Sequence, residues 1–338
     1  MLIVLVIGVF TSCQQPNKEK FTKHSFDYFD TVTTITGYAE SQEEFDAVYD
    51  EIMTLLGEYH KLFTIYHRYE GMENLCTINE LVDGAHRAVT VDRRIIDMLL
   101  YAKQAYEQTG GKVNVAMGSV LSIWHEYREI GADEPWNAAL PPMEKLQDAA
   151  LHTDINMMQI DEQSCTVTLL DPKMRLDVGA IAKGYAVEMI AQHLEQKGIG
   201  GYVLNVGGNV RTLGAKPDGS AWTVGIENPD GEEYLALLKL EGKSLITSGS
   251  YQRYYIVDGK RYHHIIDPVT LMPSEHFVSV SIVCNSSAQG DALSTALFCM
   301  DYEQGLALIE SLEGVEAMWL TTDGQKLYSS GFTRYQTE

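Results

Sequence analysis

The stretch RLDVGAIAKGYA, residues 175–186, constrains the fold of this chain more than any other. It predicts a strand, a tight turn bracketed by Gly179 and Gly184, and the start of a helix. At such a turn the free backbone N–H groups and the helix dipole favour a bound anion, above all a phosphate, and Lys183 adds a full charge. An ordinary strand-to-helix connection has the same pattern. The stretch matches neither G-x-G-x-x-G nor the phosphate loop that ends in Lys-Ser/Thr.

The first half of the chain mixes one strand pattern with several helices. Residues 26–40 are β-branched, aromatic and partly alternating, which predicts a strand. Ser41 and Glu44 form a capping box for a long amphipathic helix, and Asp92 caps a second helix that ends near residue 108. A third helix follows residue 117. Pro141 and Pro142 precede a fourth, so we expect a subdomain boundary near residues 132–142, although a single intertwined domain fits equally well.

The second half is mostly strands. Residues 157–170 predict a hairpin, and Asp258-Gly259 suits the turn of another. Glycine-punctuated strands fill much of residues 201–284, two helices follow, and a closing hairpin ends the chain. These patterns predict an α+β fold with mixed or antiparallel β-sheets and packed helices.

The charge of the chain excludes one class of partner. The net charge is −22, from 47 acidic and 25 basic residues. A nucleic-acid surface needs a basic footprint, so no nucleic acid is expected as a partner. A phosphorylated small molecule held through a divalent cation remains compatible with this charge.

The N-terminus predicts export. An apolar run too short to span a bilayer ends in Phe-Thr-Ser-Cys13, which resembles the end of a bacterial lipoprotein signal. We therefore expect residues 1–13 to be a signal ending at a lipid-bearing Cys13, with residues 14–24 as a polar tether and residues 25–338 as the functional domain. The protein would be extracytoplasmic and anchored to a bacterial membrane. A buried N-terminal strand is the alternative. The four remaining cysteines form no C-x-x-C pair, and their spacing does not fix any disulfide.

Several residues could carry chemistry. Asp291 and Thr295 are four residues apart on a predicted helix, so they share a face and offer hard oxygen ligands for Mg²⁺ or Ca²⁺. His263 and His264 end a predicted strand, and either could act as a general base with Asp267 orienting its ring. Each feature also has a purely structural explanation.

Five motifs follow one another along the chain: RLDVGAIAKGYAVE, NVGGNV, TSGSYQRYY, HHIIDP and GDALSTAL. Their order and spacing resemble those of the ApbE-type flavin transferases, and FDTVTTI, LFTIY and KVNVAMGSVLSIWH upstream are similar to that family too. The resemblance covers nearly all of the chain after residue 24. It implies a T-fold-related architecture with a smaller subdomain. It also implies FAD and a divalent cation (Mg²⁺, with Ca²⁺ or Mn²⁺ open), and transfer of FMN from FAD to a Thr or Ser hydroxyl of a partner protein, with release of AMP. Such partners are subunits of membrane redox complexes or extracytoplasmic electron-transfer proteins.

The resemblance also assigns roles to individual residues. It implies a metal site at Asp291, Thr295 and the backbone carbonyl of Ala180, and His264 as the base that deprotonates the acceptor hydroxyl. It implies that Tyr66 stacks on the isoalloxazine ring. The remaining residues expected to contact the cofactor are Phe29, Lys112, Val113, Asn114, Asp177, Lys183 and Ile265.

The chain departs from the family pattern at three places. Leu271 replaces the glycine of D-P-x-T-G, Phe29-Asp30-Thr31 replaces M-G-T, and the segment between Tyr66 and Asn79 is longer than usual. A glycine would permit positive φ where Leu271 resists it, so we expect that loop to differ in shape. Two other functions stay open: an FAD pyrophosphatase that uses water as acceptor, and a carrier lipoprotein without catalysis.

Overall fold

A single eight-stranded sheet organises the molecule. The structure, a computed structural model, describes residues 18–80, 88–231 and 233–337. The predicted signal over residues 1–13 therefore lies outside the described residues. Every neighbouring pair of strands in the sheet is antiparallel. In spatial order the strands are β1 (Glu19–Ser25), β2 (Thr33–Ala39), β6 (Tyr202–Val206), β7 (Asn209–Leu213), β10 (Ser244–Gly249), β13 (Phe277–Cys284), β14 (Glu316–Thr321) and β15 (Lys326–Tyr328).

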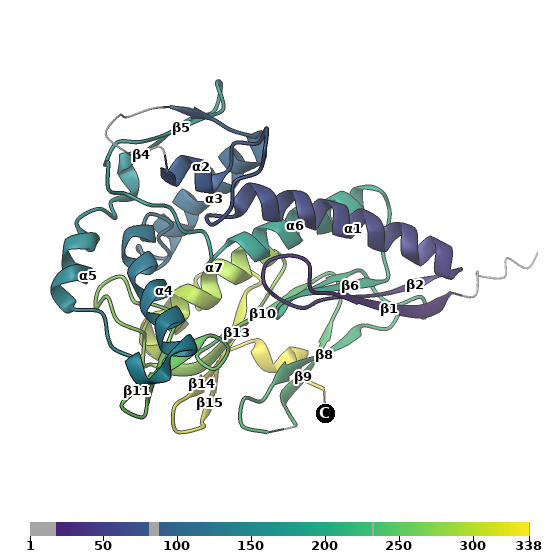
Figure 1. Cartoon of the computed structure of the whole chain (residues 1–338). Coiled ribbons are helices and arrows are strands. Elements are labelled where there is room, and N and C mark those ends of the chain that lie inside the picture. The colour runs from purple at the N-terminus through teal and green to yellow at the C-terminus, as the bar shows by residue number, and fades with distance from the viewer. Residues whose placement is uncertain (1–17, 81–87, 232, 338) are drawn as a thin grey trace, which may run out of the picture.

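Three helices cover one face of this sheet. α1 (Gln42–Phe63), α6 (Ala182–Gln196) and α7 (Ser287–Phe298) pack side by side above the strands (Figure 1), and α8 (Tyr302–Glu310) packs against β14. The predicted cap of α1 is confirmed at Ser41, whose hydroxyl accepts from the Glu44 N–H at 3.2 Å. The Glu44 carboxylate accepts from the Glu40 N–H at 2.7 Å, one residue before the Ser41 N–H that a capping box uses. The hairpin β8 (Trp222–Glu227) and β9 (Tyr234–Leu240) and the 3-10 helix Phe332–Tyr335 supply side chains to a second apolar cluster with β7, β10, β13 and β14.

Two smaller units flank the helical layer. One contains α2 (Leu75–Glu80), α3 (Arg93–Gln108) and an antiparallel sheet of β3 (Val89–Thr90), β5 (Thr166–Leu169) and β4 (Met158–Asp161). The other contains α4 (Gly118–Asp133), α5 (Met143–Ala150) and the hairpin β11 (Tyr254–Val257) and β12 (Lys260–His263), with a short 3-10 helix at Pro135–Asn137. A second 3-10 helix, Ile155–Met157, leads directly into β4. α4 and α5 share one apolar cluster around Trp124 although they lie on either side of residues 132–142. The subdomain boundary predicted there stays a prediction.

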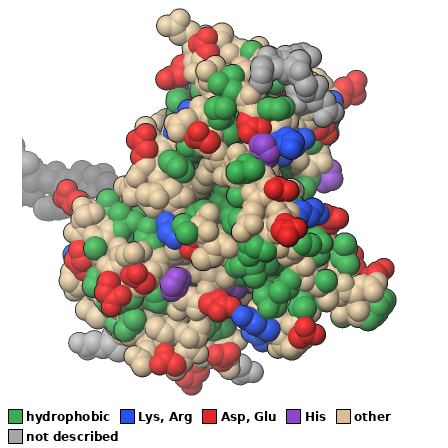
Figure 2. Space-filling view, turned by 90° about the vertical axis from the view of Figure 1, so that its left-hand side faces the viewer, with side chains coloured by type: hydrophobic (Ala, Val, Ile, Leu, Met, Phe, Trp, Pro, Cys, Tyr) green, Lys and Arg blue, Asp and Glu red, His purple; other side chains and the backbone are tan. Residues whose placement is uncertain are grey.

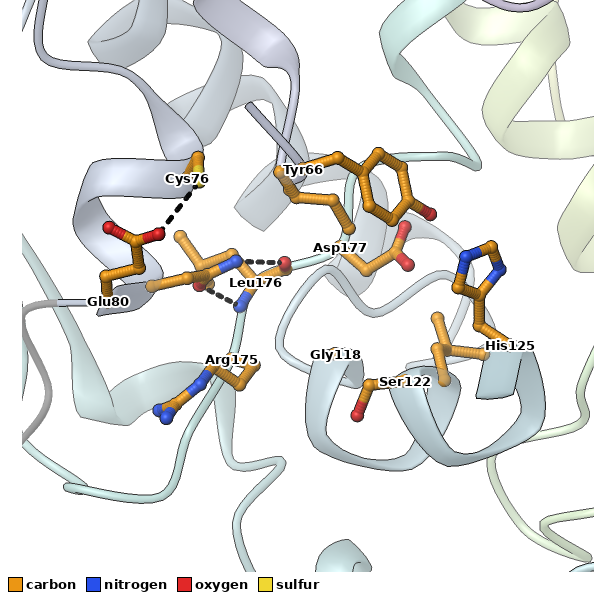
Figure 3. Close-up of a pocket in the computed structure, with 12 residues that line it drawn as sticks. Tyr66, Cys76, Glu80, Gly118, Ser122, His125, Arg175, Leu176 and Asp177 are labelled. Atoms are coloured by element: carbon orange, nitrogen blue, oxygen red, sulfur yellow. Dashed lines mark hydrogen bonds between the residues drawn. The ribbon is translucent and has the colours of Figure 1, made fainter. Parts of the chain in front are cut away.

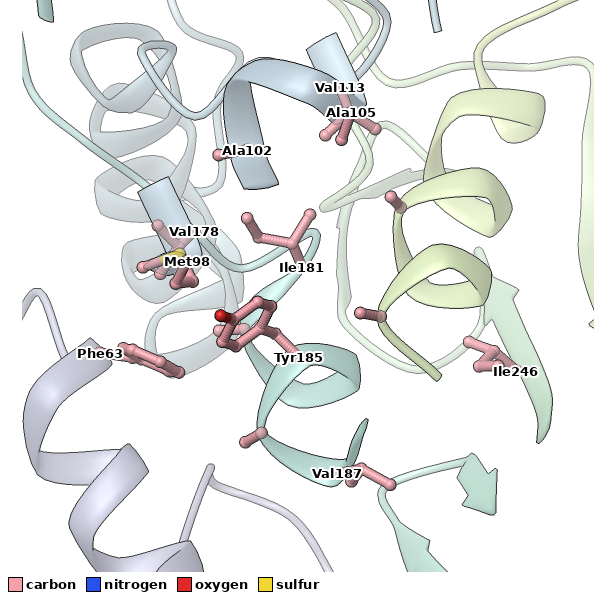
Figure 4. Packing of buried hydrophobic residues seen from close by; sticks show 14 of the residues in the cluster. Phe63, Met98, Ala102, Ala105, Val113, Val178, Ile181, Tyr185, Val187 and Ile246 are labelled. Carbon is pink, nitrogen blue, oxygen red and sulfur yellow. The ribbon is translucent and has the colours of Figure 1, made fainter. Parts of the chain in front are cut away.

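The start of α6 is fixed by packing on several sides. Ile181 and Tyr185 are buried and point toward Met98 and Ala102 of α3, with Phe63 of α1 close by (Figure 4). Each fully buried apolar side chain of this size contributes about 1.5–3 kcal/mol. The backbone just before α6 is therefore held in place by the core rather than by local propensity.

Three sequence predictions are wrong in this part of the chain. The polar tether predicted for residues 14–24 is a strand from Glu19 onward: β1 pairs with β2, and Phe21 packs on the Phe45 ring at 5.5 Å. The alternating lysines concealed this pattern. The strand predicted from residue 26 begins only at Thr33, because Phe29 and Asp30 take positive φ of 59° and 49°.

The third wrong prediction is the strand before the central turn. Residues 174–178 form no strand; instead, the side chain of Asn79 takes the place of a neighbouring strand. Its amide oxygen accepts from the Leu176 N–H at 2.7 Å, and its amide nitrogen donates to the Leu176 carbonyl at 2.9 Å. Asp177 N–H donates to the Val115 carbonyl at 2.8 Å. The segment is extended but held by loops and a side chain.

Cys76, Cys165, Cys284 and Cys299 are all free thiols among the described residues. Within the same part of the chain, no helix is both long and apolar enough to cross a bilayer.

Candidate functional site

A pocket of about 570 Å³ opens where α2, α4 and the segment before α6 meet. Its walls include Tyr66, Gly118, His125, Leu176 and Asp177. Figure 2 shows the face of the molecule that carries α4 and α5, where hydrophobic side chains gather near the middle and acidic side chains are spread around them. The pocket is thus partly apolar and bordered by charge, as sites for aromatic cofactors commonly are.

Tyr66, His125 and Asp177 line one side of this pocket. The ring centroids of Tyr66 and His125 are 5.3 Å apart at an interplanar angle of 36°, and the Asp177 carboxylate lies on the same side of the pocket (Figure 3). The Tyr66 side chain is 54% exposed, so its face is available to a guest. Although half of the residue is open to solvent, desolvation of its hydroxyl by the surrounding protein, reinforced by the charge of Asp177, raises the pKa of Tyr66, which therefore keeps its proton. Burial likewise raises the pKa of Asp177, whose Oδ1 accepts from the Gly179 N–H at 2.8 Å.

The two adjacent histidines have different roles. His263 is buried, and its Nε2 lies 2.7 Å from the Ser274 carbonyl. A carbonyl only accepts, so Nε2 carries the proton and Nδ1 accepts from the Ile265 N–H at 3.2 Å. Both ring nitrogens of His263 are therefore satisfied, and the residue is structural.

His264 instead keeps one nitrogen free. Its Nδ1 donates to the Arg253 carbonyl at 3.2 Å, and its backbone N–H donates to the same carbonyl at 3.1 Å. This contact fixes the neutral tautomer with the proton on Nδ1, and no described residue bonds to Nε2. Burial, with Arg128 and Arg253 adding to it, lowers the pKa of His264 to about 3. The Nε2 lone pair is thus unprotonated at neutral pH.

Sequence reasoning missed three residues of this region: His125, Arg128 and Arg253. Arg128 donates to His125 Nδ1 at 2.7 Å, and Arg253 donates to the Asp30 carbonyl at 3.3 Å. The pattern H-E-Y-R-E is typical of a solvated helix face, and Arg253 stands inside the motif TSGSYQRYY with no spacing signal of its own. The spacing of His125 and Arg128, three residues apart on one helix, was the available signal.

Two of the predicted metal ligands, Asp291 and Thr295, lie on α7, which packs against α6. The Gly184 N–H donates to Asp291 Oδ2 at 2.8 Å, and Thr295 lies one turn further along α7. Ala180 precedes α6 in the turn, and the charge of Lys183 acts on Asp291. Burial raises the pKa of Asp291, which marks a carboxylate that lacks solvent and gains from a cation.

This donor set fits a hard cation that also binds substrate. It holds a carboxylate, a hydroxyl and a backbone carbonyl, the ligand types that Mg²⁺ takes when phosphates complete its shell. Among the described residues, no group of three His, Cys, Asp or Glu side chains converges on one point. These residues therefore offer no metal site in which protein side chains supply every ligand.

The other predicted contact residues lie around these two centres. Phe29 stands edge-on to His60 at 5.5 Å, at the end of the loop before β2. Val113 and Ile265 are buried in the core, so they offer a guest little side-chain surface. Asn114 is held by bonds to the Thr153 carbonyl and the Ala116 N–H.

Asp267 does not orient a histidine ring, contrary to the sequence prediction. It forms an ion pair with Lys112 at 2.9 Å, and its other oxygen accepts from the Val269 and Thr270 N–H groups at 2.6 and 3.2 Å. These bonds stabilise the loop after β12. The predicted cofactor residue Lys112 is thereby tied to a buried carboxylate.

Leu271 adopts the backbone geometry that a glycine would. Its φ is 60°, its side chain is buried beside Trp124, and its carbonyl accepts from the Trp124 indole N–H at 2.9 Å. The prediction that leucine would resist positive φ here is wrong, because side-chain packing offsets the strain.

Comparison with known proteins gives a consistent result. The family model described as "ApbE family" matches residues 29–319. An FAD:protein FMN transferase of Klebsiella pneumoniae is 32% identical over 281 residues, covering 80% of this chain and 84% of the relative. A protein of the same name from Treponema pallidum is 33% identical over 304 residues, covering 85% and 81%.

Solved structures agree with this match. The ApbE protein of Thermotoga maritima superimposes with a TM-score of 0.82 at 25% identity, covering 95% of this chain and all of that one. The flavin transferase ApbE of Vibrio cholerae gives a TM-score of 0.77 at 25% identity, covering 94% and 99%. The predicted α+β fold with antiparallel sheets is confirmed.

Proposed function

The chain belongs to the ApbE family, and from this premise we propose that it transfers FMN from FAD to a Thr or Ser hydroxyl of a partner protein and releases AMP. The observation that carries the proposal is the tautomer of His264: Nδ1 donates to a carbonyl and Nε2 is left with a free lone pair. A neutral imidazole with one free nitrogen is suited to take a proton from an attacking hydroxyl.

In the proposed reaction the acceptor hydroxyl gives its proton to His264 Nε2. The oxygen then attacks the phosphorus of the FMN half, the bond to the bridging oxygen breaks, and AMP leaves with that electron pair. Little covalent work falls to the protein in such a transfer, so positioning and electrostatics dominate. Tyr66, with its exposed face over the pocket, would hold the isoalloxazine ring by stacking.

Asp291, Thr295 and the Ala180 carbonyl would hold Mg²⁺, with Ca²⁺ or Mn²⁺ as alternatives. When bound, the ion would neutralise charge that develops on the phosphoryl oxygens. Lys183 and the N–H groups at the start of α6 would add positive potential on the same side. Asp177, next to the turn, would contact the nucleotide from the pocket side.

We also propose that the protein works outside the cytoplasm, anchored to the membrane by a lipid on Cys13. The support is the sequence alone: an apolar run that ends in Phe-Thr-Ser-Cys13. At that location, the proposed acceptor proteins are subunits of membrane redox complexes. Labelling with a radioactive fatty acid, in the wild type and in Cys13→Ser, tests the anchor; equal label in both would contradict it.

The function is tested by the intact mass of an acceptor domain after incubation with FAD, Mg²⁺ and this protein. The expected result is a gain of one FMN on a Thr or Ser, lost in His264→Gln. His276→Gln is the matched control, because His276 is exposed on a nearby loop, and it should label the acceptor normally. AMP release without an adduct would make the protein an FAD pyrophosphatase, and binding without either product would make it a carrier.

A further inference from the structure

Two arginines from different elements meet beside His264. Arg128 lies on α4, and Arg253 immediately precedes β11. The two elements approach closely because residue 131 is glycine: a Cβ there would lie 2.4 Å from the ring of Tyr255. Arg128 sits about one turn before Gly131. Arg253 precedes Tyr255 by two residues, and its carbonyl accepts from His264. The packing therefore brings the two arginines close enough that the charge of each acts on His264 and the charge of Arg253 acts on Arg128.

Among the residues that the structure describes, neither arginine has a carboxylate partner. None of the ion pairs found among the described residues includes Arg128 or Arg253. Arg128 donates to a neutral ring nitrogen of His125, and Arg253 donates to a backbone carbonyl. Most of their N–H donors remain unused.

Arg128 is the half-buried member of the pair, whereas Arg253 is exposed to solvent. Burial lowers the pKa of Arg128, and the nearby charge of Arg253 lowers it further, although Tyr66, Glu129 and Asp177 partly compensate. In a chain with 47 acidic and 25 basic residues, carboxylate partners are plentiful elsewhere. Two neighbouring guanidinium groups without one indicate a place for an anion that comes from outside.

We propose that Arg128 and Arg253 bind the phosphoryl oxygens of the FMN half of FAD. This inference rests on the proposed function, because His264 can assist an attack on that phosphorus only if the phosphoryl group lies beside it. The Arg253 carbonyl accepts from His264 Nδ1, so the residue that carries the guanidinium group is in direct contact with the proposed base. Arg128 reaches toward the Tyr66–His125 wall where the flavin ring would stack. Planar N–H forks match phosphoryl oxygens and oppose the charge that builds on them during transfer.

Comparing ligands with and without the phosphate tests this role. The dissociation constants of FMN and of riboflavin are measured by flavin fluorescence with the full chain and Mg²⁺, in wild type, Arg128→Gln, Arg253→Gln and Arg253→Lys. Losing one charge-assisted contact is expected to weaken FMN binding by about tenfold in each Gln variant. Riboflavin, which lacks the phosphate, should bind equally well to all of them, and Arg253→Lys should retain part of the affinity for FMN.

Arg261→Gln is the matched control. Arg261 lies on the neighbouring strand β12, stacks on the Tyr254 ring at 4.9 Å and has no assigned role here, so FMN affinity should stay unchanged. Thermal midpoints of all variants identify any that fail to fold. Equal weakening of FMN and riboflavin would overturn the inference, and so would unchanged FMN affinity. If both affinities hold while transfer falls, the arginines serve the acceptor protein and not the nucleotide.

The binding assay is independent of turnover. If the wild type produced neither AMP nor an adduct, the proposed function would fail, yet the difference between FMN and riboflavin would still decide whether the two arginines hold a phosphate.

Discussion

The backbone N–H of Gly184 donates to the buried carboxylate of Asp291 at 2.8 Å, and a Cβ at residue 184 would lie 2.4 Å from the Asp291 Cβ. This close approach locks the start of α6 onto α7. It brings the turn at residues 179–183 and the Asp291–Thr295 face together, which neither helix achieves alone.

Gly184→Ala should therefore damage both stability and activity. The added methyl would also lie 2.4 Å from the Ser287 carbonyl, so the helices must separate. Overpacking of this kind costs about 1–3 kcal/mol. Urea unfolding measures the loss. Gly200→Ala is the control, since its Cβ would find only the Leu213 carbonyl at 3.7 Å. A Gly184→Ala protein as stable and active as wild type would refute the locking role.

Asp291→Asn should separate metal binding from folding. The amide oxygen can still accept from Gly184, and a charge penalised by burial is removed, so the metal-free variant should be at least as stable as wild type. With ADP present and Mg²⁺ at about 100 times its Kd, wild type should gain about 2.7 kcal/mol and the variant nothing.

Thermal unfolding with and without Mg²⁺ and ADP measures this gain. Asp230→Asn, an exposed change, should respond as wild type does. Equal stabilisation of Asp291→Asn and wild type by the ion would place the metal elsewhere.

His264 should make the fold sensitive to mild acid. Its folded pKa of about 3 lies below the unfolded value near 6.5, so between these values the unfolded chain binds more protons and stability falls as pH falls. Arg128, Arg253 and His263 all add to this depression. Above pH 6.5 the His264 imidazole is unprotonated in both states and contributes nothing to the pH dependence of stability.

The corresponding experiment compares urea unfolding at pH 7 and pH 5. The loss of stability on acidification should be smaller in His264→Gln than in wild type by about 1–2 kcal/mol. His276→Gln should behave as wild type. An equal loss in wild type and His264→Gln would mean that the imidazole is protonated normally in the folded state.

Leu271 and Asp30 form a matched pair for backbone strain. Both take positive φ, 60° and 49°, but Leu271 is buried and Asp30 is exposed. Asp30→Gly should stabilise the protein by up to about 1 kcal/mol because only strain is relieved. Leu271→Gly also relieves strain but deletes a core side chain, whose truncation costs about 2–5 kcal/mol, so it should destabilise. Denaturant midpoints that rise for Leu271→Gly would show that packing does not hold this loop.

Much of the fold follows from local signals in the sequence. The cap at Ser41, the cap at Asp92 and the turn at Asp258-Gly259 each specify their element through short-range chemistry, and the structure has all three. β1 was missed because its pairing with β2 is a tertiary contact and its lysines resemble a solvated tether. The segment at Leu176 has the apolar pattern of a strand but forms none. The side chain of Asn79 supplies the hydrogen bonds that a neighbouring strand would.

Only part of the candidate site could be predicted from local signals in the sequence. Asp291 and Thr295 share a helix face, which spacing alone reveals. Residue type and spacing did not separate His263 from His264, and only the family resemblance pointed to His264. The physical distinction lies in which carbonyl each ring contacts. Arg128 and Arg253 are 125 positions apart, and only the contact of Gly131 with Tyr255 brings them together.

The most direct test of the account is the ratio of AMP released to acceptor labelled in one reaction with FAD and Mg²⁺. The account predicts one AMP per FMN adduct, release that depends on the acceptor, and loss of both products in His264→Gln. AMP that accumulates without acceptor, or in excess of the adduct, would contradict it and show that water takes the place of the protein hydroxyl.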